Sequence, residues 1–232
     1  MRLVTFTKFG PEQAGVLTLA GDSVVPFSAA GVSEDSIQSL ISGWTVQKQE
    51  SLQQAAESGE GSIPLKDVNL LAPIPRPVHD ALCVGQNYVA HAIESARFKG
   101  IEYKKPAYPV IFSKRVDCAV SPKGEIPAHE DVTSQLDYEA ELAVVIGQTA
   151  SHVSREDAYS VVFGYTVAND VSARDLQNRH KQFTMGKGLD GFLPMGPCLV
   201  TRDELPEPPV LGVRSWVNDE ARQNGRTDGF IF

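Results

Sequence analysis

The sequence is poor in cysteine and has no long apolar run. Its three cysteines, Cys83, Cys118 and Cys198, are an odd number at wide spacings, which argues against a disulfide framework and a zinc knuckle. We expect them to be reduced and mostly buried. No stretch reaches the roughly 20 apolar residues of a membrane span. The opening segment MRLVTFTKFG alternates like a strand and lacks the pattern of a signal or transit peptide. These features predict a cytoplasmic protein, although a mitochondrial location stays open.

Basic residues are also scarce. Lys and Arg total 21 against 29 Asp and Glu, which gives a formal net charge of −8. Because nothing concentrates positive charge on one segment, nucleic acid and the membrane surface are not expected partners. The 232 residues are 42% hydrophobic and 22% charged, a composition typical of a globular chain with one substantial core and a small accessory domain.

The pattern of the chain changes near residue 70. Residues 1–70 begin with short alternating segments separated by glycine-containing turns, which predict antiparallel strands. Two helical segments follow, with Ser33 as the expected N-cap and Gly59 as the expected stop. Three prolines between residues 73 and 77 then favour an ordered connector. We therefore predict a small N-terminal β-plus-helix domain, residues 1–70, and a main domain, residues 71–232.

The main domain opens with a strand-like segment and a helical one, ALCVGQNYVAHAIES. His91 and Glu94 stand three residues apart on the predicted helix, so that the carboxylate could orient the imidazole. A solvated surface pair is the alternative, because His and Glu neighbours are common on helices. Further along, VVFGYTVAND reads as a buried strand that ends in a polar cluster beginning with Asn169 and Asp170, a position where enzymes often carry chemical groups.

An acidic stretch, LDYEAELAVVIG, sets Asp137, Glu139 and Glu141 directly before an apolar run. On a strand, Glu139 and Glu141 would face the same side, joined by Asp137 if the strand reaches back that far. Carboxylates that share a partly desolvated space repel one another, and a divalent cation would relieve this repulsion. Oxygen ligands select Mg²⁺ or Mn²⁺ over zinc, with Asp170 as the third ligand. The alternative is an exposed strand face with solvated acids.

A glycine-rich segment, GKGLDG at residues 186–191, matches the spacing of a dinucleotide-binding fingerprint. That motif needs a helix directly after its glycines, whereas Pro194 and Pro197 follow here. We therefore reject a nucleotide site and expect a mobile or tightly turned loop that carries Lys187 near the acidic residues. An ordinary solvated lysine is the alternative.

Five segments together resemble the fumarylacetoacetate hydrolase superfamily, particularly its acylpyruvate hydrolase and oxaloacetate decarboxylase branch. They cover roughly residues 70 to 232 and occur in the order GQNYVAHAIE, PVIFSK, LDYEAELAVVIG, GYTVANDVSARDLQ and GKGLDGFLPMGPCLV. The resemblance implies an α+β, β-rich fold, a mixed β-sandwich roll with flanking helices. It also implies a homodimer, a Mg²⁺ or Mn²⁺ site and a small-molecule 2-oxo acid substrate.

The same resemblance assigns roles to individual residues. Glu139, Glu141 and Asp170 match metal ligands, His91 and Glu94 match a water-activating dyad on a lid helix, and Lys187 matches a lysine beside the bound acid. The remaining residues are expected to bind substrate or to support the metal ligands: Asn87, Tyr88, Arg174, Asp175 and Gln177.

The implied chemistry is cleavage of a C–C bond in a 2-oxo acid through a metal-stabilised enolate. An acylpyruvate or fumarylacetoacetate hydrolase is the first reading, with His91 activating the water. An oxaloacetate decarboxylase and a 2-hydroxymuconate-type isomerase or decarboxylase are the alternatives. Family members continue beyond the point that matches Phe232, through a Thr-Gly-Thr-Pro segment. The sequence is therefore expected to be C-terminally incomplete, and a catalytically silent protein that binds metal and 2-oxo acid is the alternative of another class.

Overall fold

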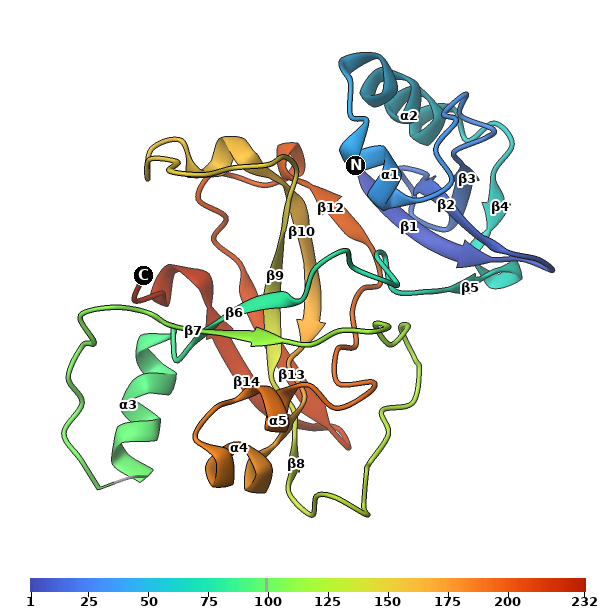
Figure 1. The fold of residues 1–232 in the computed structure, drawn as a ribbon. Helices are drawn as coiled ribbons and strands as arrows, with labels where there is room; N and C mark the ends of the chain where they lie inside the picture. Colours follow the sequence, from blue (N-terminus) through green and yellow to red (C-terminus); the bar gives the residue numbers. More distant parts are fainter. Residues whose placement is uncertain (99) are drawn as a thin grey trace.

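The computed structural model describes residues 1–98 and 100–232. It is an α+β fold in which strands dominate over five helices, so the predicted β-rich class is confirmed. Figure 1 shows α1, α2 and β1 to β5 gathered at one side of the molecule, with α3, α4 and α5 away from them. No helix in the described ranges has both the length and the apolar character needed to cross a membrane.

The largest sheet has eight strands in the order β4–β3–β2–β1–β12–β10–β9, and β5 also pairs with β1. Its strands are β1 (Arg2–Thr7), β2 (Glu12–Leu17), β3 (Ser23–Pro26), β4 (Ile63–Pro64), β5 (Asn69–Leu70), β9 (Ala140–Ile146), β10 (Val162–Asn169) and β12 (Leu199–Thr201). Three further pairs are β6 (Ala81–Gly85) with β7 (Val110–Lys114), β8 (Leu136–Asp137) with β11 (Ser172–Ala173), and β13 (Gly212–Val217) with β14 (Glu220–Arg226). The ladders between these strands are antiparallel.

Five helices flank the sheets: α1 (Ile37–Ser42), α2 (Val46–Ser58), α3 (Val89–Phe98), α4 (Arg174–His180) and α5 (Thr184–Lys187). Ser36, three residues after the expected Ser33, caps α1, because its hydroxyl accepts a hydrogen bond from the backbone N–H of Ser39. The predicted stop at Gly59 is confirmed. This residue ends α2 in the left-handed region, with φ 65°, where glycine is favoured.

The main sheet contains strands from both sides of residue 70, where the sequence pattern changes. Leu3 in β1 pairs with Leu199 in β12, and Val200 in β12 pairs with Tyr165 in β10. The apolar core follows the same path, because Leu3 and Leu40 cluster with Phe163 and Leu199. The division into residues 1–70 and 71–232 stays a prediction, and the two parts share one hydrogen-bonded sheet.

The predicted acidic residues lie in or next to the paired strands β9 and β10. Gly164 in β10 lets β12 approach closely, since a Cβ at this position would lie 2.2 Å from the carbonyl oxygen of Val200. β10 then runs to its end at Asn169, and the chain passes through Asp170 into β11 and α4. The end of β10 therefore delivers the polar cluster next to the start of β9.

The cysteines are free thiols. Cys83 and Cys198 are half-buried, whereas Cys118 is exposed. The expectation that they would be mostly buried is therefore wrong for Cys118, which lies between the polar residue Asp117 and the buried Ala119. Burial raises the pKa of the Cys83 thiol to about 12, and the nearby charge of Asp170 adds to this effect.

Candidate active site

The acidic stretch lies on two short strands with a break between them. Asp137 ends β8, Glu141 lies in β9, and Glu139 sits in the break. The prediction that one strand would carry both Glu139 and Glu141 is therefore wrong, and β9 does not reach back to Asp137. Two hydrogen bonds fix the backbone of Glu139 between the strands. Its N–H donates to Oδ1 of Asn169 (2.9 Å), and its carbonyl oxygen accepts from the N–H of Asp170 (2.8 Å).

A side chain from β14 fixes the backbone between the two glutamates. Oε1 of Gln223 accepts a hydrogen bond from the N–H of Ala140 (2.8 Å), and its Nε2 donates to the carbonyl oxygen of the same residue (3.4 Å). This contact spans 83 residues, so the sequence alone gave no signal for it. Gln223 thereby fixes the spacing of Glu139 and Glu141.

Lys187 joins two of the predicted ligands. Its Nζ donates to Oε2 of Glu139 (2.5 Å) and to Oδ2 of Asp170 (2.8 Å). The residue is 2% exposed and ends the short helix α5. The alternative of a solvated lysine is therefore wrong. Residues 188–191 form a turn as predicted, but Lys187 itself belongs to the helix, which points its side chain inward. The predicted proximity of Lys187 to the acidic residues is confirmed.

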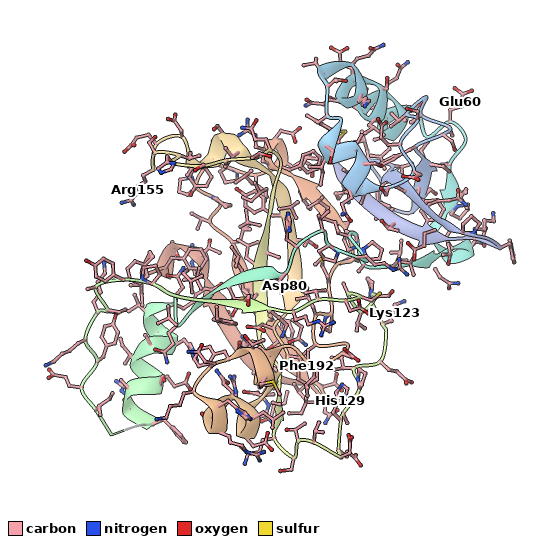
Figure 2. All side chains as sticks on the ribbon, in the orientation of Figure 1. Glu60, Asp80, Lys123, His129, Arg155 and Phe192 are labelled. Carbon is pink, nitrogen blue, oxygen red and sulfur yellow. The ribbon has the colours of Figure 1, made fainter. Side chains whose placement is uncertain are left out.

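Lys114 is a second buried cation, to which the sequence analysis assigned no role. It ends β7, is fully buried, and its Nζ lies 2.7 Å from Oδ1 of Asp170. The same ammonium donates to the carbonyl oxygens of Val171 (2.8 Å) and Lys187 (2.5 Å). It also lies 5.7 Å from the ring centre of Phe192, which is labelled in Figure 2. Lys114 therefore ties β7 to the end of β10 and to α5.

Burial and the neighbouring lysines shift the pKa of Asp170 in opposite directions. Burial raises the pKa of this carboxyl, but Lys114 and Lys187 outweigh burial and bring the pKa below its ordinary value. Burial also lowers the pKa of the Lys114 ammonium, an effect that the charge of Asp170 only partly offsets. With a carboxylate and two carbonyl oxygens around it, we take Lys114 to be charged at neutral pH.

Arg174, at the start of α4, braces the other side of the acidic stretch. Its guanidinium donates to Oδ2 of Asp137 (2.7 Å), Oε1 of Glu139 (2.5 Å) and Oε1 of Gln177 (2.8 Å). The neighbouring Asp175 accepts hydrogen bonds from the hydroxyl of Thr133 (2.6 Å) and from the backbone N–H of the residue after Thr133. These contacts are those expected of residues that support the acidic stretch.

Glu141 differs from the other two carboxylates. No Lys, Arg or His side chain within residues 1–98 and 100–232 forms an ion pair with it. Its pKa is raised to about 7, first by burial and then by the negative charges of Glu139 and Asp170. Among the described residues, Glu141 is therefore a carboxylate of the cluster without a cationic partner.

The site fits a hard divalent cation in charge and donor type. Its three carboxylates offer only oxygen ligands, as Mg²⁺ and Mn²⁺ prefer. Oδ1 of Asp170 is buried and accepts no hydrogen bond, although Lys114 lies nearby. Within the described part of the chain, no three His, Cys, Asp or Glu side chains form a ready-made ligand group, and the ammonium of Lys187 lies between Glu139 and Asp170. A cation at these carboxylates would compete with that ammonium.

His91 and Glu94 lie on α3 as predicted. Nδ1 of His91 is 4.0 Å from Oε2 of Glu94, and the two side chains are 53% and 83% exposed. Across residues 1–98 and 100–232, neither of them contacts the carboxylates through a hydrogen bond or an ion pair that would join α3 to the cluster. The structure brings the two residues together but leaves them on the surface, so their catalytic role stays a prediction.

Asn87 and Tyr88 precede α3. Asn87 accepts hydrogen bonds from the backbone N–H groups of Ile231 (2.7 Å) and Phe232 (3.0 Å). Tyr88 pairs with Phe230, with ring centres 4.9 Å apart. Burial raises the pKa of Tyr88 to about 12, and the charge of Glu141 adds to this. Asn87 therefore holds the last residues of the chain, while Tyr88 lies within the electrostatic reach of the acidic cluster.

Comparisons with known proteins agree with this geometry. Residues 80–232 match the model of the C-terminal domain of fumarylacetoacetate (FAA) hydrolase. An oxaloacetate tautomerase of Bacillus subtilis is 48% identical over 176 residues, which cover 76% of this chain and 57% of that protein. The chain thus spans little more than half the length of this relative.

Two solved structures resemble the whole chain. A fumarylacetoacetate hydrolase from Exiguobacterium antarcticum is 33% identical, with a TM-score of 0.79 over 100% of this chain and 77% of that one. A maleylpyruvate hydrolase from a Sphingobium species, solved with manganese(II) and pyruvate, is 28% identical, with a TM-score of 0.74 over 100% and 78% of the two chains. The relatives are therefore named for tautomerisation and for hydrolysis.

Proposed function

Because the chain belongs to the fumarylacetoacetate hydrolase family, we propose that its acidic cluster binds a small 2-oxo acid and converts the enol of oxaloacetate into the keto form. The observation that carries the choice of reaction is the 48% identity with an oxaloacetate tautomerase. The sequence analysis ranked hydrolysis first, whereas the relative from Bacillus subtilis favours tautomerisation.

Lys187 is the proposed contact for the substrate anion. It is a cation held within 2.8 Å of two carboxylates, and a dication bound at those carboxylates would free its ammonium to bind an oxygen of the substrate. Arg174 would keep Glu139 in position through its hydrogen bond to Oε1, and Lys114 would keep Asp170 in position. The two lysines therefore have different roles: Lys187 contacts the ligand and Lys114 positions the site.

Glu139, Glu141 and Asp170 would hold Mg²⁺ or Mn²⁺. When bound, the dication supplies Lewis-acid stabilisation of negative charge on the substrate oxygens. The manganese and pyruvate named for the Sphingobium structure support this choice of metal class.

The reaction moves one proton. In the enol-to-keto direction the enol oxygen would lose its proton to solvent, C3 would gain a proton, and the double bond between C2 and C3 would become the double bond between C2 and its oxygen. His91 is the proposed proton donor to C3, because its imidazole is half exposed and Glu94 lies beside it. Lys187 would stabilise the oxygen as its proton leaves. This assignment requires α3 to approach the cluster when substrate binds.

Hydrolysis of an acylpyruvate is the second candidate. It is supported by the two solved structures, which are named as hydrolases. Here His91 would take a proton from water, and the hydroxide would attack the distal carbonyl carbon; the bond between that carbon and C3 would then break, and the departing pyruvate enolate would take up a proton at C3. A silent protein that binds metal and 2-oxo acid would show binding without turnover of either substrate.

The test follows the loss of enol absorbance after oxaloacetate enol is mixed with the chain and Mg²⁺. We expect faster decay with the parent and a loss of about 100-fold or more in Asp170→Asn, which removes one charge from the metal site. Glu60→Gln is the matched control, because Glu60 is an exposed carboxylate far from the site (Figure 2). Equal decay with and without the parent, together with cleavage of an acylpyruvate, would replace tautomerisation by hydrolysis.

A further inference from the structure

The β13–β14 hairpin turns one face toward the acidic stretch. Along β14, Gln223 and Gly225 are half-buried, whereas Arg222 and Asn224 are exposed. This alternation is that of a strand with one covered face. On the covered face, Gln223 lies opposite Ser215 of β13. The hairpin therefore presents a glutamine amide to the start of β9.

The amide of Gln223 completes the edge of β9. This strand is the last one in the order of the main sheet, and Ala140 is its first residue. A residue at a sheet edge has an N–H and a carbonyl oxygen without a strand partner. Gln223 takes the place of that partner, because its Oε1 accepts from the N–H of Ala140 (2.8 Å) and its Nε2 donates to the carbonyl oxygen (3.4 Å). The backbone of Ala140 is thereby held at both of its polar atoms.

Ser215 holds the amide of Gln223 in turn. Its hydroxyl donates to Oε1 of Gln223 (2.8 Å), so that this oxygen accepts two hydrogen bonds and uses both of its lone pairs. The amide cannot reverse without breaking its bond to the N–H of Ala140, since its NH₂ group only donates. A chain of contacts therefore runs from β13 through Gln223 to β9.

Ala140 is the residue between Glu139 and Glu141, so its backbone angles set the spacing of the two glutamates. Glu139 is held from the other side, because its N–H and carbonyl oxygen bond to Asn169 and Asp170. A cation bound by both glutamates must match this spacing. Mg²⁺ demands oxygen ligands at about 2.1 Å in nearly octahedral geometry, whereas Ca²⁺ accepts longer and more variable distances. A fixed spacing therefore matters more for Mg²⁺ than for Ca²⁺.

We propose that Gln223 is a positioning residue that gives the acidic site its preference for a small dication. The inference rests on the proposed function for the presence of the cation. Gln223 acts through the backbone of Ala140 rather than on the ion itself. When the amide is removed, the edge of β9 loosens at this residue, and the site loses much of its preference for Mg²⁺ over Ca²⁺.

The experiment compares Gln223→Met, which keeps the length of the side chain and removes the amide, with Asn224→Leu. Asn224 is the matched control, because its amide bonds to Arg214 across the same hairpin on the exposed face. Mg²⁺ and Ca²⁺ are titrated separately by calorimetry into each metal-free protein. Gln223→Met should bind Mg²⁺ about tenfold more weakly than the parent and Ca²⁺ less than about threefold more weakly. Asn224→Leu should bind both cations as the parent does.

Ser215→Ala is the second variant, since it leaves the amide of Gln223 in place but removes one of its partners. It should shift the ratio of the two dissociation constants in the same direction as Gln223→Met, by about two- to threefold. A ratio unchanged in both variants would overturn the inference. Equal losses for Mg²⁺ and Ca²⁺ in Gln223→Met would overturn it too, because they would indicate general damage to the site.

The parent protein separates this inference from the proposed function. A parent that binds neither cation would overturn the inference together with the proposed metal site. If the preference for Mg²⁺ depends on Gln223 but oxaloacetate enol is not converted, the proposed reaction fails and the inference stands.

Discussion

The two ends of the molecule, the N-terminal end of the main sheet and the end that carries the acidic cluster, bury opposite kinds of side chain. At the N-terminal end, Leu3, Phe6 and Leu40 are fully buried, and the ion pair between Arg76 and Glu12 lies on the surface. At the other end, charged groups are buried, while apolar residues of the β6–β7 pair face outward: Lys114 is 0% exposed and Leu82 is 78% exposed. One end follows the usual rule for a globular core, and the other reverses it.

This difference shows that the two ends are stabilised by different forces. Burial of apolar surface stabilises the N-terminal end and tolerates changes in detail. Buried charges are stable only while every partner is present, because removing one leaves the other desolvated and unpaired. We therefore expect the N-terminal end to respond to the volume of a substitution and the site end to its charge.

The largest effect is expected in the N-terminal core. Phe6→Ala removes a fully buried ring and should lower the free energy of unfolding by about 4 to 5 kcal/mol, through lost burial and a cavity. Urea denaturation measures this. Phe9→Ala is the control and should change little, because Phe9 is fully exposed. Equal stability of the two variants would contradict the apolar account of this end.

Loss of a buried cation should come next. Lys114→Met keeps much of the volume but leaves Asp170 and two carbonyl oxygens without this partner, so the free energy of unfolding should fall by about 3 to 4 kcal/mol. Lys66→Met, at an exposed position, should cost less than about 0.5 kcal/mol. Adding Asp170→Asn to Lys114→Met should recover part of the loss. A double variant no more stable than Lys114→Met alone would show that the two charges are not coupled.

The missing cationic partner of Glu141 should affect how the stability of the protein depends on pH. The pKa of Glu141 is raised from 4.5 to about 7 in the folded protein, so folding favours its protonated form. Its stabilising contribution is present below pH 4.5 and is lost as pH rises through 7, a difference of about 3 kcal/mol. With metal removed by a chelator, Glu141→Gln should therefore be more stable than the parent at pH 8, and this advantage should shrink at pH 5.

Mg²⁺ provides the control for this pH effect. If Glu141 binds the cation, saturating Mg²⁺ should stabilise the parent at pH 8 and leave Glu141→Gln nearly unchanged. Melting curves of both proteins, recorded at both pH values with and without Mg²⁺, give the comparison. An equal Mg²⁺ effect on the two proteins would remove Glu141 from the metal site.

The smallest effect concerns a helix end. Ser36→Ala removes the hydroxyl that caps α1 and should lower the free energy of unfolding by about 1 kcal/mol. Ser33→Ala tests the cap expected from sequence and should be neutral, because Ser33 is exposed and α1 starts four residues later. Denaturation midpoints of the two variants separate the alternatives, and a larger loss at Ser33 would reverse the assignment.

Local patterns account for what the sequence predicted well. Alternation of apolar and polar residues gave the N-terminal strands, Gly59 gave the end of α2, and the helical composition after Tyr88 gave α3. The proximity of Glu139 and Asp170 followed from two strand-like segments with polar ends. Each of these signals lies within a few residues, where periodicity and conformational preference act.

Contacts between distant segments could not be predicted in this way. Lys114 meets carbonyl oxygens 57 and 73 residues away, and a lysine at the end of an apolar strand usually reaches solvent. The break before Glu141 depends on Asn169 and Gln223, which approach from other strands. The roles of His91 and Glu94, and the identity of the metal, stay predictions because they concern a bound state.

The pairing of β1 has a consequence for synthesis. One edge of this strand pairs with β2 from Leu3 to Thr7, while on the other edge β5 covers Phe6 and Thr7 and β12 covers Arg2 and Leu3. Because β12 is translated nearly 200 residues after β1, the nascent chain exposes part of an apolar strand edge until β12 has been synthesised. Closure of such a distant contact is slow. The open edge is therefore a place where a chaperone, or another unfinished chain, can bind first.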